Sequence, residues 1–192
     1  MTHFFADDGE KIHVHVSGDG APILMLHGWT ASHREWSPFL DQLTAHHRVF
    51  RWDARGHGGH RLTRDTAPTV QRMAQDLHNL IEHFDLNQLV AVGHSMGALT
   101  LWQYIEDRGC RSLRKVCFLD QSPKLLTDAE WMNGIYGDFD RERSAAFLRH
   151  LESDFAESVL LLGAMGLNER ARDKYQQGSR GLDKARQWLK EQ

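Results

Sequence analysis

Residues 89–97 read Leu89-Val90-Ala91-Val92-Gly93-His94-Ser95-Met96-Gly97. The apolar run at the start is typical of a strand covered on both faces of a sheet, and the apolar residues from Leu99 to Ile105 predict a helix after it. A G-x-S-x-G pattern between a strand and a helix predicts a tight turn that strains the backbone of Ser95 and exposes its Oγ atom above the sheet. The alternative is a serine that only caps the helix after a glycine turn. The flanking strand and helix favour the exposed nucleophile.

Strands and helices alternate on both sides of this turn. Further strands are expected at 12–16, 23–26, 49–52 and 116–119, with residues 3–6 as the hairpin partner of the first, and helices are expected at 36–43 and 70–84. Four alternations of strand and helix require right-handed crossovers. We therefore predict an α/β fold with a mainly parallel, twisted sheet and flanking helices.

After Pro123 the pattern changes to amphipathic stretches without a convincing strand, and one helical pattern runs from Glu152 to Met165. We predict a core at residues 1–123 and a helical cap or lid at 124–192. Apolar side chains at 124–165 are expected to roof the pocket of the core.

The composition is that of an ordinary globular domain. Of 192 residues, 41% are hydrophobic and 26% are charged, and the net charge is −3 with histidine neutral. Because this balance provides no basic field, we expect neither a nucleic-acid nor a membrane partner. Residues 1–8 lack a basic segment and a long apolar run, so no signal peptide is expected and the protein is predicted to be cytoplasmic.

The two cysteines, Cys110 and Cys117, have no partner cluster and predict reduced, partly buried thiols. None of the 13 histidines stands in an H-E-x-x-H or similarly strong metal-binding spacing. We therefore predict no metal site, and no cofactor motif is visible.

Two further motifs follow earlier strands: Leu26-His27-Gly28-Trp29 and Asp53-Ala54-Arg55-Gly56-His57-Gly58. Together with the turn around Ser95, they resemble the serine-nucleophile type of the α/β-hydrolase superfamily. The resemblance covers residues 10–123 and is much weaker afterwards. It implies an α/β-hydrolase fold that is incomplete at its C-terminal side.

The resemblance also implies roles for individual residues. The backbone N–H groups of Trp29 and Met96 would form the oxyanion hole. His27, Gly28, His94, Trp131 and Tyr136 would contact substrate, although a purely structural role is the favoured alternative for His27. In the second motif, Asp53 would organise its turn and Arg55 would pair locally, so neither is the expected catalytic acid.

A serine triad also needs an acid and a histidine, in the order Ser, acid, His in this superfamily. Asp120 ends the strand after the nucleophile helix and is the candidate acid, with a strand-end turn residue as an equal alternative. His150 is the only histidine beyond Asp120, and we interpret it as a surface residue of a cap helix. The last strands and the catalytic histidine are expected to be missing through truncation, cleavage or as a natural remnant, so activity is expected to be impaired.

The leading function is therefore a hydrolase of an ester, thioester, lactone or related acyl compound, acting through an acyl-Ser95 intermediate on a small apolar or acyl substrate. Asp-nucleophile chemistry such as epoxide hydrolysis is disfavoured. Two alternatives stay open: a cofactor-free dioxygenase acting on a heteroaromatic substrate, and a non-catalytic binding protein. The strand edge at 114–120 is expected to pair with a second copy or with a C-terminal fragment.

Overall fold

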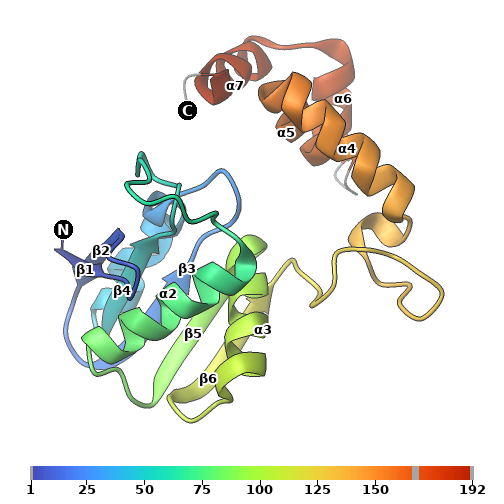
Figure 1. The fold of residues 1–192 in the computed structure, drawn as a ribbon. Helices are drawn as coiled ribbons and strands as arrows, with labels where there is room; N and C mark the ends of the chain where they lie inside the picture. The colour runs from blue at the N-terminus through green and yellow to red at the C-terminus, as the bar shows by residue number, and fades with distance from the viewer. Residues whose placement is uncertain (1, 166–168, 191–192) are drawn as a thin grey trace. The chain divides into compact units, whose positions relative to one another are not determined.

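The computed structural model describes residues 2–165 and 169–190 (Figure 1). The chain forms two compact units, Met1–Pro123 and Lys124–Gln192. Among the described residues, no helix is both long enough and apolar enough to span a membrane.

The first unit is built on a six-stranded sheet with the order β1-β2-β4-β3-β5-β6 (Figure 1). Its strands are β1 (Thr2–Phe5), β2 (Lys11–Ser17), β3 (Ala21–Leu26), β4 (His47–Asp53), β5 (Leu89–His94) and β6 (Leu113–Leu119). The pairs β4–β3, β3–β5 and β5–β6 are parallel, whereas β1–β2 and β2–β4 are antiparallel. The mainly parallel sheet and the N-terminal hairpin expected from the sequence are confirmed.

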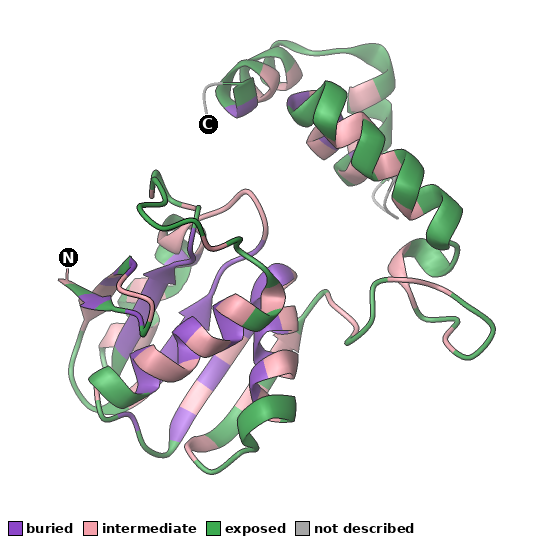
Figure 2. Ribbon diagram, viewed as in Figure 1, coloured by how far each residue is buried: buried purple, intermediate pink, exposed green. Residues whose placement is uncertain are grey.

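Helices cover both faces of this sheet. The helices α2 (Val70–His83) and α3 (Met96–Arg108) bury one face, and the short helices η1 (His33–Phe39) and α1 (Leu40–Thr44) pack on the other. Leu77, Leu80 and Leu101 are completely buried in the larger core, and Trp36 is buried in the smaller one. The strands at the middle of the sheet are mostly buried (Figure 2). Because β3, β4, β5 and β6 are parallel, their carboxyl ends lie at one edge of the sheet, and the turns that follow them meet there.

The edge strand β6 is only partly covered. Cys117 is exposed and Leu119 is 39% exposed, whereas Val116 and Phe118 pack against the larger core. Both cysteines are free and exposed, so the prediction of partly buried thiols was wrong. The physical reason is that Val116 and Phe118 turn toward the larger core, whereas Cys117 alternates to the opposite face of the strand.

The second unit combines an irregular segment at its start with several helices, and its described residues contain no strand. After the short turn η2 (Ile135–Gly137) it contains α4 (Arg141–Ser153), α5 (Phe155–Met165), α6 (Glu169–Gln177) and α7 (Arg180–Lys190). The helix expected from Glu152 to Met165 is interrupted at Asp154, whose backbone is extended and whose side chain accepts a hydrogen bond from the Glu157 N–H. A side-chain cap of this kind satisfies a helix N-terminus and starts a new helix.

Candidate active site

Ser95 occupies the turn between β5 and α3 in a conformation that few residues other than glycine adopt. Its φ is 48° and its ψ is −112°. Its N–H donates to the Leu119 carbonyl oxygen at 3.0 Å, and its own carbonyl accepts from the Leu99 N–H at 3.0 Å. A positive φ at a residue with a side chain costs about 1–3 kcal/mol and persists only where the surroundings hold it. The strained, strand-to-helix turn predicted for Ser95 is present.

The glycines on either side of Ser95 are required by close approach of neighbouring backbone. A Cβ atom on Gly93 would lie 2.6 Å from the carbonyl carbon of Gly97. A Cβ atom on Gly97 would lie 2.6 Å from the carbonyl carbon of Leu26 and closer still to its oxygen. The turn therefore packs closely against the end of β3. This contact fixes the position of Ser95 relative to the loop that follows β3.

In the loop after β3, Gly28 lies directly beside the turn at Ser95. A Cβ atom on Gly28 would be 2.9 Å from His94 Nδ1 and 3.5 Å from Ser95 Cβ. The two residues predicted to form the oxyanion hole follow these two positions, Trp29 after Gly28 and Met96 after Ser95. Met96 is the first residue of α3, where N–H groups have no acceptor within the helix. The oxyanion roles remain predictions.

Glu35 on η1 connects the two turns and was missed by the sequence analysis. Its Oε2 atom accepts a hydrogen bond from the Gly28 N–H at 2.8 Å, and its Oε1 atom lies 2.5 Å from His94 Nδ1. The hydrogen bond to Glu35 raises the pKa of His94, and this outweighs burial, which acts in the opposite direction. Burial alone would raise the pKa of Glu35, but its bonds to His94 and Gly28 lower it. No motif surrounds Glu35 in the sequence, so only the fold reveals this pair.

Asp120, the predicted acid, lies at the same edge of the sheet. The register pairs His94 of β5 with Leu119 of β6, so Asp120 follows beside Ser95. Asp120 is exposed and has a positive φ of 53°. Its charge also contributes to the raised pKa of His94. The structure thus brings Asp120 close to the nucleophile turn, while its role as an acid remains a prediction.

His27 and Arg55, from the two loop motifs, are both buried and hydrogen-bonded, and the role predicted for Arg55 needs correction. His27 is completely buried, its Nδ1 atom lies 2.8 Å from the Gly28 carbonyl oxygen, and its Nε2 atom accepts from the Ala54 N–H at 3.0 Å. Burial lowers the pKa of His27 to about 4. Both ring nitrogens have partners, which fits the structural role favoured for His27 from the sequence, and its contact with substrate stays a prediction. Arg55 does not pair locally, because its buried guanidinium bonds Asp76 of α2 and Asp8.

The remaining candidates lie in the second unit. Trp131 donates from Nε1 to the Lys124 carbonyl oxygen at 3.2 Å, and Tyr136 donates from its hydroxyl to the Leu162 carbonyl oxygen at 2.5 Å. Contact of Trp131 and Tyr136 with substrate therefore stays a prediction. The Nδ1 atom of His150 on α4 lies 2.5 Å from the Oγ atom of Ser158 on α5. This contact gives His150 a structural partner within its own unit.

The chain is similar to known proteins over most of its length. The family model described as alpha/beta hydrolase fold matches residues 21–180. A non-heme haloperoxidase from Rhodococcus erythropolis is 31% identical over 136 residues, which cover 68% of this chain and 47% of the relative. The chain spans about half the length of the curated relatives it matches.

Solved structures agree on the architecture. A bromoperoxidase from Bacillus anthracis superimposes with a TM-score of 0.76 at 25% identity, over 88% of this chain and 63% of that one. An esterase from Exiguobacterium antarcticum gives a TM-score of 0.76 at 22% identity, over 98% of this chain and 72% of that one. The second likeness concerns the fold alone.

Proposed function

This chain belongs to the alpha/beta hydrolase fold family, and from that membership we propose that it carries the nucleophile of a serine hydrolase acting on an ester, thioester, lactone or related acyl compound. The observation that supports the proposal most is the conformation of Ser95, with φ 48° and ψ −112°, at the end of a central parallel strand and the start of a helix. This conformation is costly, and a serine that merely capped the helix would not need it.

In the proposed reaction, Ser95 Oγ attacks the acyl carbonyl carbon, and the hydroxyl proton passes to a base. The carbonyl oxygen becomes an oxyanion, which the N–H groups of Trp29 and Met96 stabilise. The tetrahedral intermediate then expels the alcohol or thiol, which takes up the proton, and leaves an acyl-Ser95 ester that water hydrolyses. Each preorganised oxyanion donor is worth about 10²–10³-fold in rate.

Glu35 supports this reaction by holding the loop that contains one of these donors. Its carboxylate accepts the Gly28 N–H, so the peptide that leads to Trp29 is fixed against the nucleophile turn. The second oxygen holds the His94 ring next to Ser95. We assign Glu35 a positioning role and no proton transfer.

The base is the part of the machinery that these residues do not supply. In the family order a histidine follows the acid, and His150 is the only histidine after Asp120 in the sequence. Because the Nδ1 atom of His150 is engaged by Ser158, we propose that it is not the base. The chain by itself should therefore acylate slowly, since loss of the histidine of a serine triad costs about 10⁶ in kcat.

Chemical rescue tests this proposal. The chain is incubated with p-nitrophenyl acetate, with and without added imidazole as a replacement base, and acetyl-Ser95 is detected by intact mass and peptide mapping. We expect imidazole to accelerate acylation of the native chain beyond its rate with Ser95→Ala. Ser37→Ala, at an exposed serine of η1, is the matched control and should behave like the native chain.

Equal acylation of the native chain and Ser95→Ala, with and without imidazole, would contradict the proposal. Oxygen uptake with a quinolone substrate is measured in parallel, because uptake abolished by Ser95→Ala would instead favour the dioxygenase alternative. Saturable binding of an ester without acylation of Ser95 would favour a non-catalytic binding protein.

A further inference from the structure

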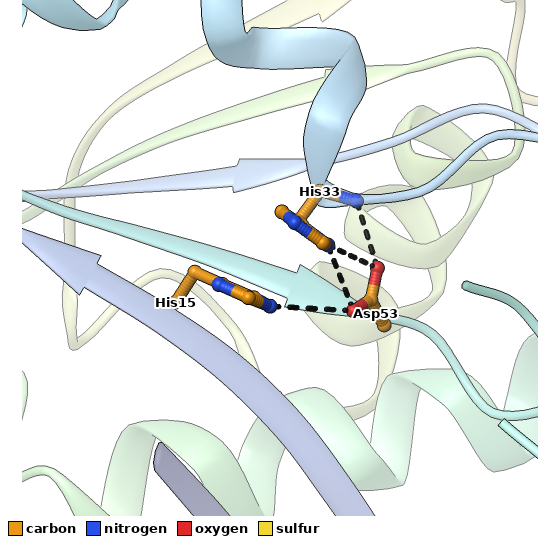
Figure 3. Close-up of side chains that lie close together, drawn as sticks. All are labelled: His15, His33 and Asp53. Atoms are coloured by element: carbon orange, nitrogen blue, oxygen red, sulfur yellow. Dashed lines mark hydrogen bonds and ion pairs between the residues drawn. The ribbon is translucent and has the colours of Figure 1, made fainter. Parts of the chain in front are cut away.

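A second cluster of chemically reactive side chains lies apart from Ser95, between β2, β4 and the start of η1. It consists of His15 on β2, His33 at the first position of η1 and Asp53 at the end of β4 (Figure 3). None of these residues has a part in the proposed hydrolase reaction. A site formed by these three residues is therefore independent of the proposed reaction.

Each of the three side chains places one ligand atom in the same small region. Asp53 Oδ2 lies 2.9 Å from His33 Nδ1 and 3.7 Å from His15 Nε2, as the dashed lines in Figure 3 show. The three ligand atoms lie within 4.8 Å of one another. An ion bonded to each at about 2.0–2.2 Å would tolerate separations up to about 4.4 Å. The side chains must therefore adjust before all three atoms can surround one ion.

The hydrogen bonding leaves one group in this cluster unsatisfied. Asp53 Oδ1 accepts the His33 backbone N–H at 2.8 Å, which fixes the carboxylate in place. In contrast, His15 Nε2 is shielded from solvent and has no hydrogen-bond partner among the described residues. An orphaned imidazole nitrogen aimed at a buried carboxylate costs free energy unless a further group completes the contact.

The chemistry of the donors favours a transition-metal ion. Two imidazole nitrogens and one carboxylate oxygen suit Zn²⁺ and other first-row divalent ions better than Ca²⁺ or Mg²⁺, which prefer oxygen ligands. Three protein ligands leave a further position for water, as in open zinc sites. The spacing of these residues in the sequence could not show the site, because they come from three separate elements.

The rings must turn for both nitrogens to reach one ion. The imidazoles of His15 and His33 are stacked, with centroids 3.5 Å apart and planes at 13°. The terminal torsion of histidine is broad and soft, and the two side chains are 21% and 17% exposed, so each ring can rotate toward solvent. Arg51 is a positive charge near the cluster and would oppose a bound cation. Its guanidinium donates to the His33 carbonyl oxygen at 3.4 Å rather than to Asp53.

We propose that His15, His33 and Asp53 form a binding site for a divalent transition-metal ion, with Zn²⁺ as its representative. The ion would join β2, β4 and η1 at one point. Because η1 also carries Glu35, which holds Gly28 beside Ser95, the ion would restrain the loop next to the nucleophile as well. Its role is a structural brace, and no step of the hydrolase reaction passes through it.

Calorimetric titration of the full chain with Zn²⁺ tests the site, using His15→Phe as the decisive variant. Phenylalanine keeps the ring stack on His33 and removes the ligand nitrogen. His3→Phe is the matched control, because His3 lies on the outer strand β1, near the rings of Phe5 and His13 and apart from the three ligands. Thermal unfolding without metal checks that each variant folds.

We expect one Zn²⁺ per native chain, an unchanged affinity for His3→Phe and an affinity weakened at least about tenfold for His15→Phe, since even indirect partners of a metal site contribute that much. Zn²⁺ should raise the midpoint of thermal unfolding of the native chain and not that of His15→Phe. Co²⁺ bound in place of Zn²⁺ should give ligand-field bands without thiolate charge transfer.

Three results would overturn the proposal. The first is the lack of saturable binding near one equivalent, and the second is equal affinity of His15→Phe and the native chain. The third is thiolate charge transfer with Co²⁺, which would assign the ion to the exposed Cys110 or Cys117.

Discussion

The substitution Gly97→Ala near the N-terminus of α3 changes the free energy of unfolding through two opposing effects. Gly97 is the second residue of this helix, and alanine is the better helix former by about 0.8–1.0 kcal/mol. Helix propensity alone would therefore make the variant more stable. The contact with β3 predicts the opposite, and its magnitude decides the outcome.

The alanine Cβ would lie 2.6 Å from the carbonyl carbon and 2.8 Å from the Cβ of Leu26, and closer still to the Leu26 oxygen. These atoms belong to a central strand, so no flexible side chain can give way. Overpacking costs about 1–3 kcal/mol and more where backbone must shift, and we take a value near 3. The net loss should be about 2 kcal/mol, or roughly 8 °C in the unfolding midpoint of a unit of this size.

Urea unfolding followed by near-ultraviolet circular dichroism measures this loss, and hydrogen exchange of peptides from β3 and α3 locates it in the first unit. Gly163→Ala on α5 is the control for propensity, because its added Cβ meets nothing within 4 Å. It should leave the first unit unchanged and stabilise its own helix by up to about 1 kcal/mol. If Gly97→Ala were as stable as the native chain or more so, the close packing inferred for the nucleophile turn would be wrong.

Three further predictions concern other parts of the first unit. Burial alone would raise the pKa of Glu10, but hydrogen bonds, with His60 first among them, lower it from an ordinary 4.5 to about 2; its stabilising effect is thus complete above about pH 4.5 and is lost as the pH falls toward 2. Acid titration of unfolding should show this loss in the native chain and a flatter profile in Glu10→Gln, and identical profiles would refute it. Glu35→Ala leaves the Gly28 N–H without its acceptor and should cost about 1–3 kcal/mol in urea unfolding, with faster exchange at that amide; an unaltered amide would show that the bond is absent. The edge of β6 should promote self-association, and Cys117→Lys should reduce it in sedimentation velocity; a native chain that stays monomeric at all concentrations would exclude this.

The features that the sequence predicted are those fixed by neighbours in the chain. The strand before Ser95, the turn and the helix after it all follow from apolar patterning and from glycines within 89–105. The hairpin of β1 and β2 and the helix α2 were likewise expected from their patterns. In each case, the residues that determine the element are contiguous.

The contacts that escaped prediction depend on the register and crossing of separate elements. Whether Glu35 reaches His94 depends on how η1 packs on the sheet, and no periodicity in the sequence encodes that. The same applies to Arg55, whose expected local partner is replaced by Asp76 on α2. His15 is opposite Arg51 in the antiparallel register of β2 and β4, and a shift by one residue would turn it to the other face.

The nucleophile turn is held from several sides within residues 1–123. Gly93 and Gly97 permit the approach of β3, the Leu119 carbonyl anchors the Ser95 N–H, and Glu35 ties the loop of Gly28 to His94. These contacts fix the backbone that presents a nucleophile and the loop proposed to stabilise an oxyanion, and none of them involves a proton acceptor for Ser95. Geometry and activation are therefore separable in this protein, since acylation can be limited by the base while the turn is fully formed. A base added in solution should then act on a preformed turn, so the acceleration by imidazole should depend on Ser95 and should be lost in Gly97→Ala even where that variant remains folded.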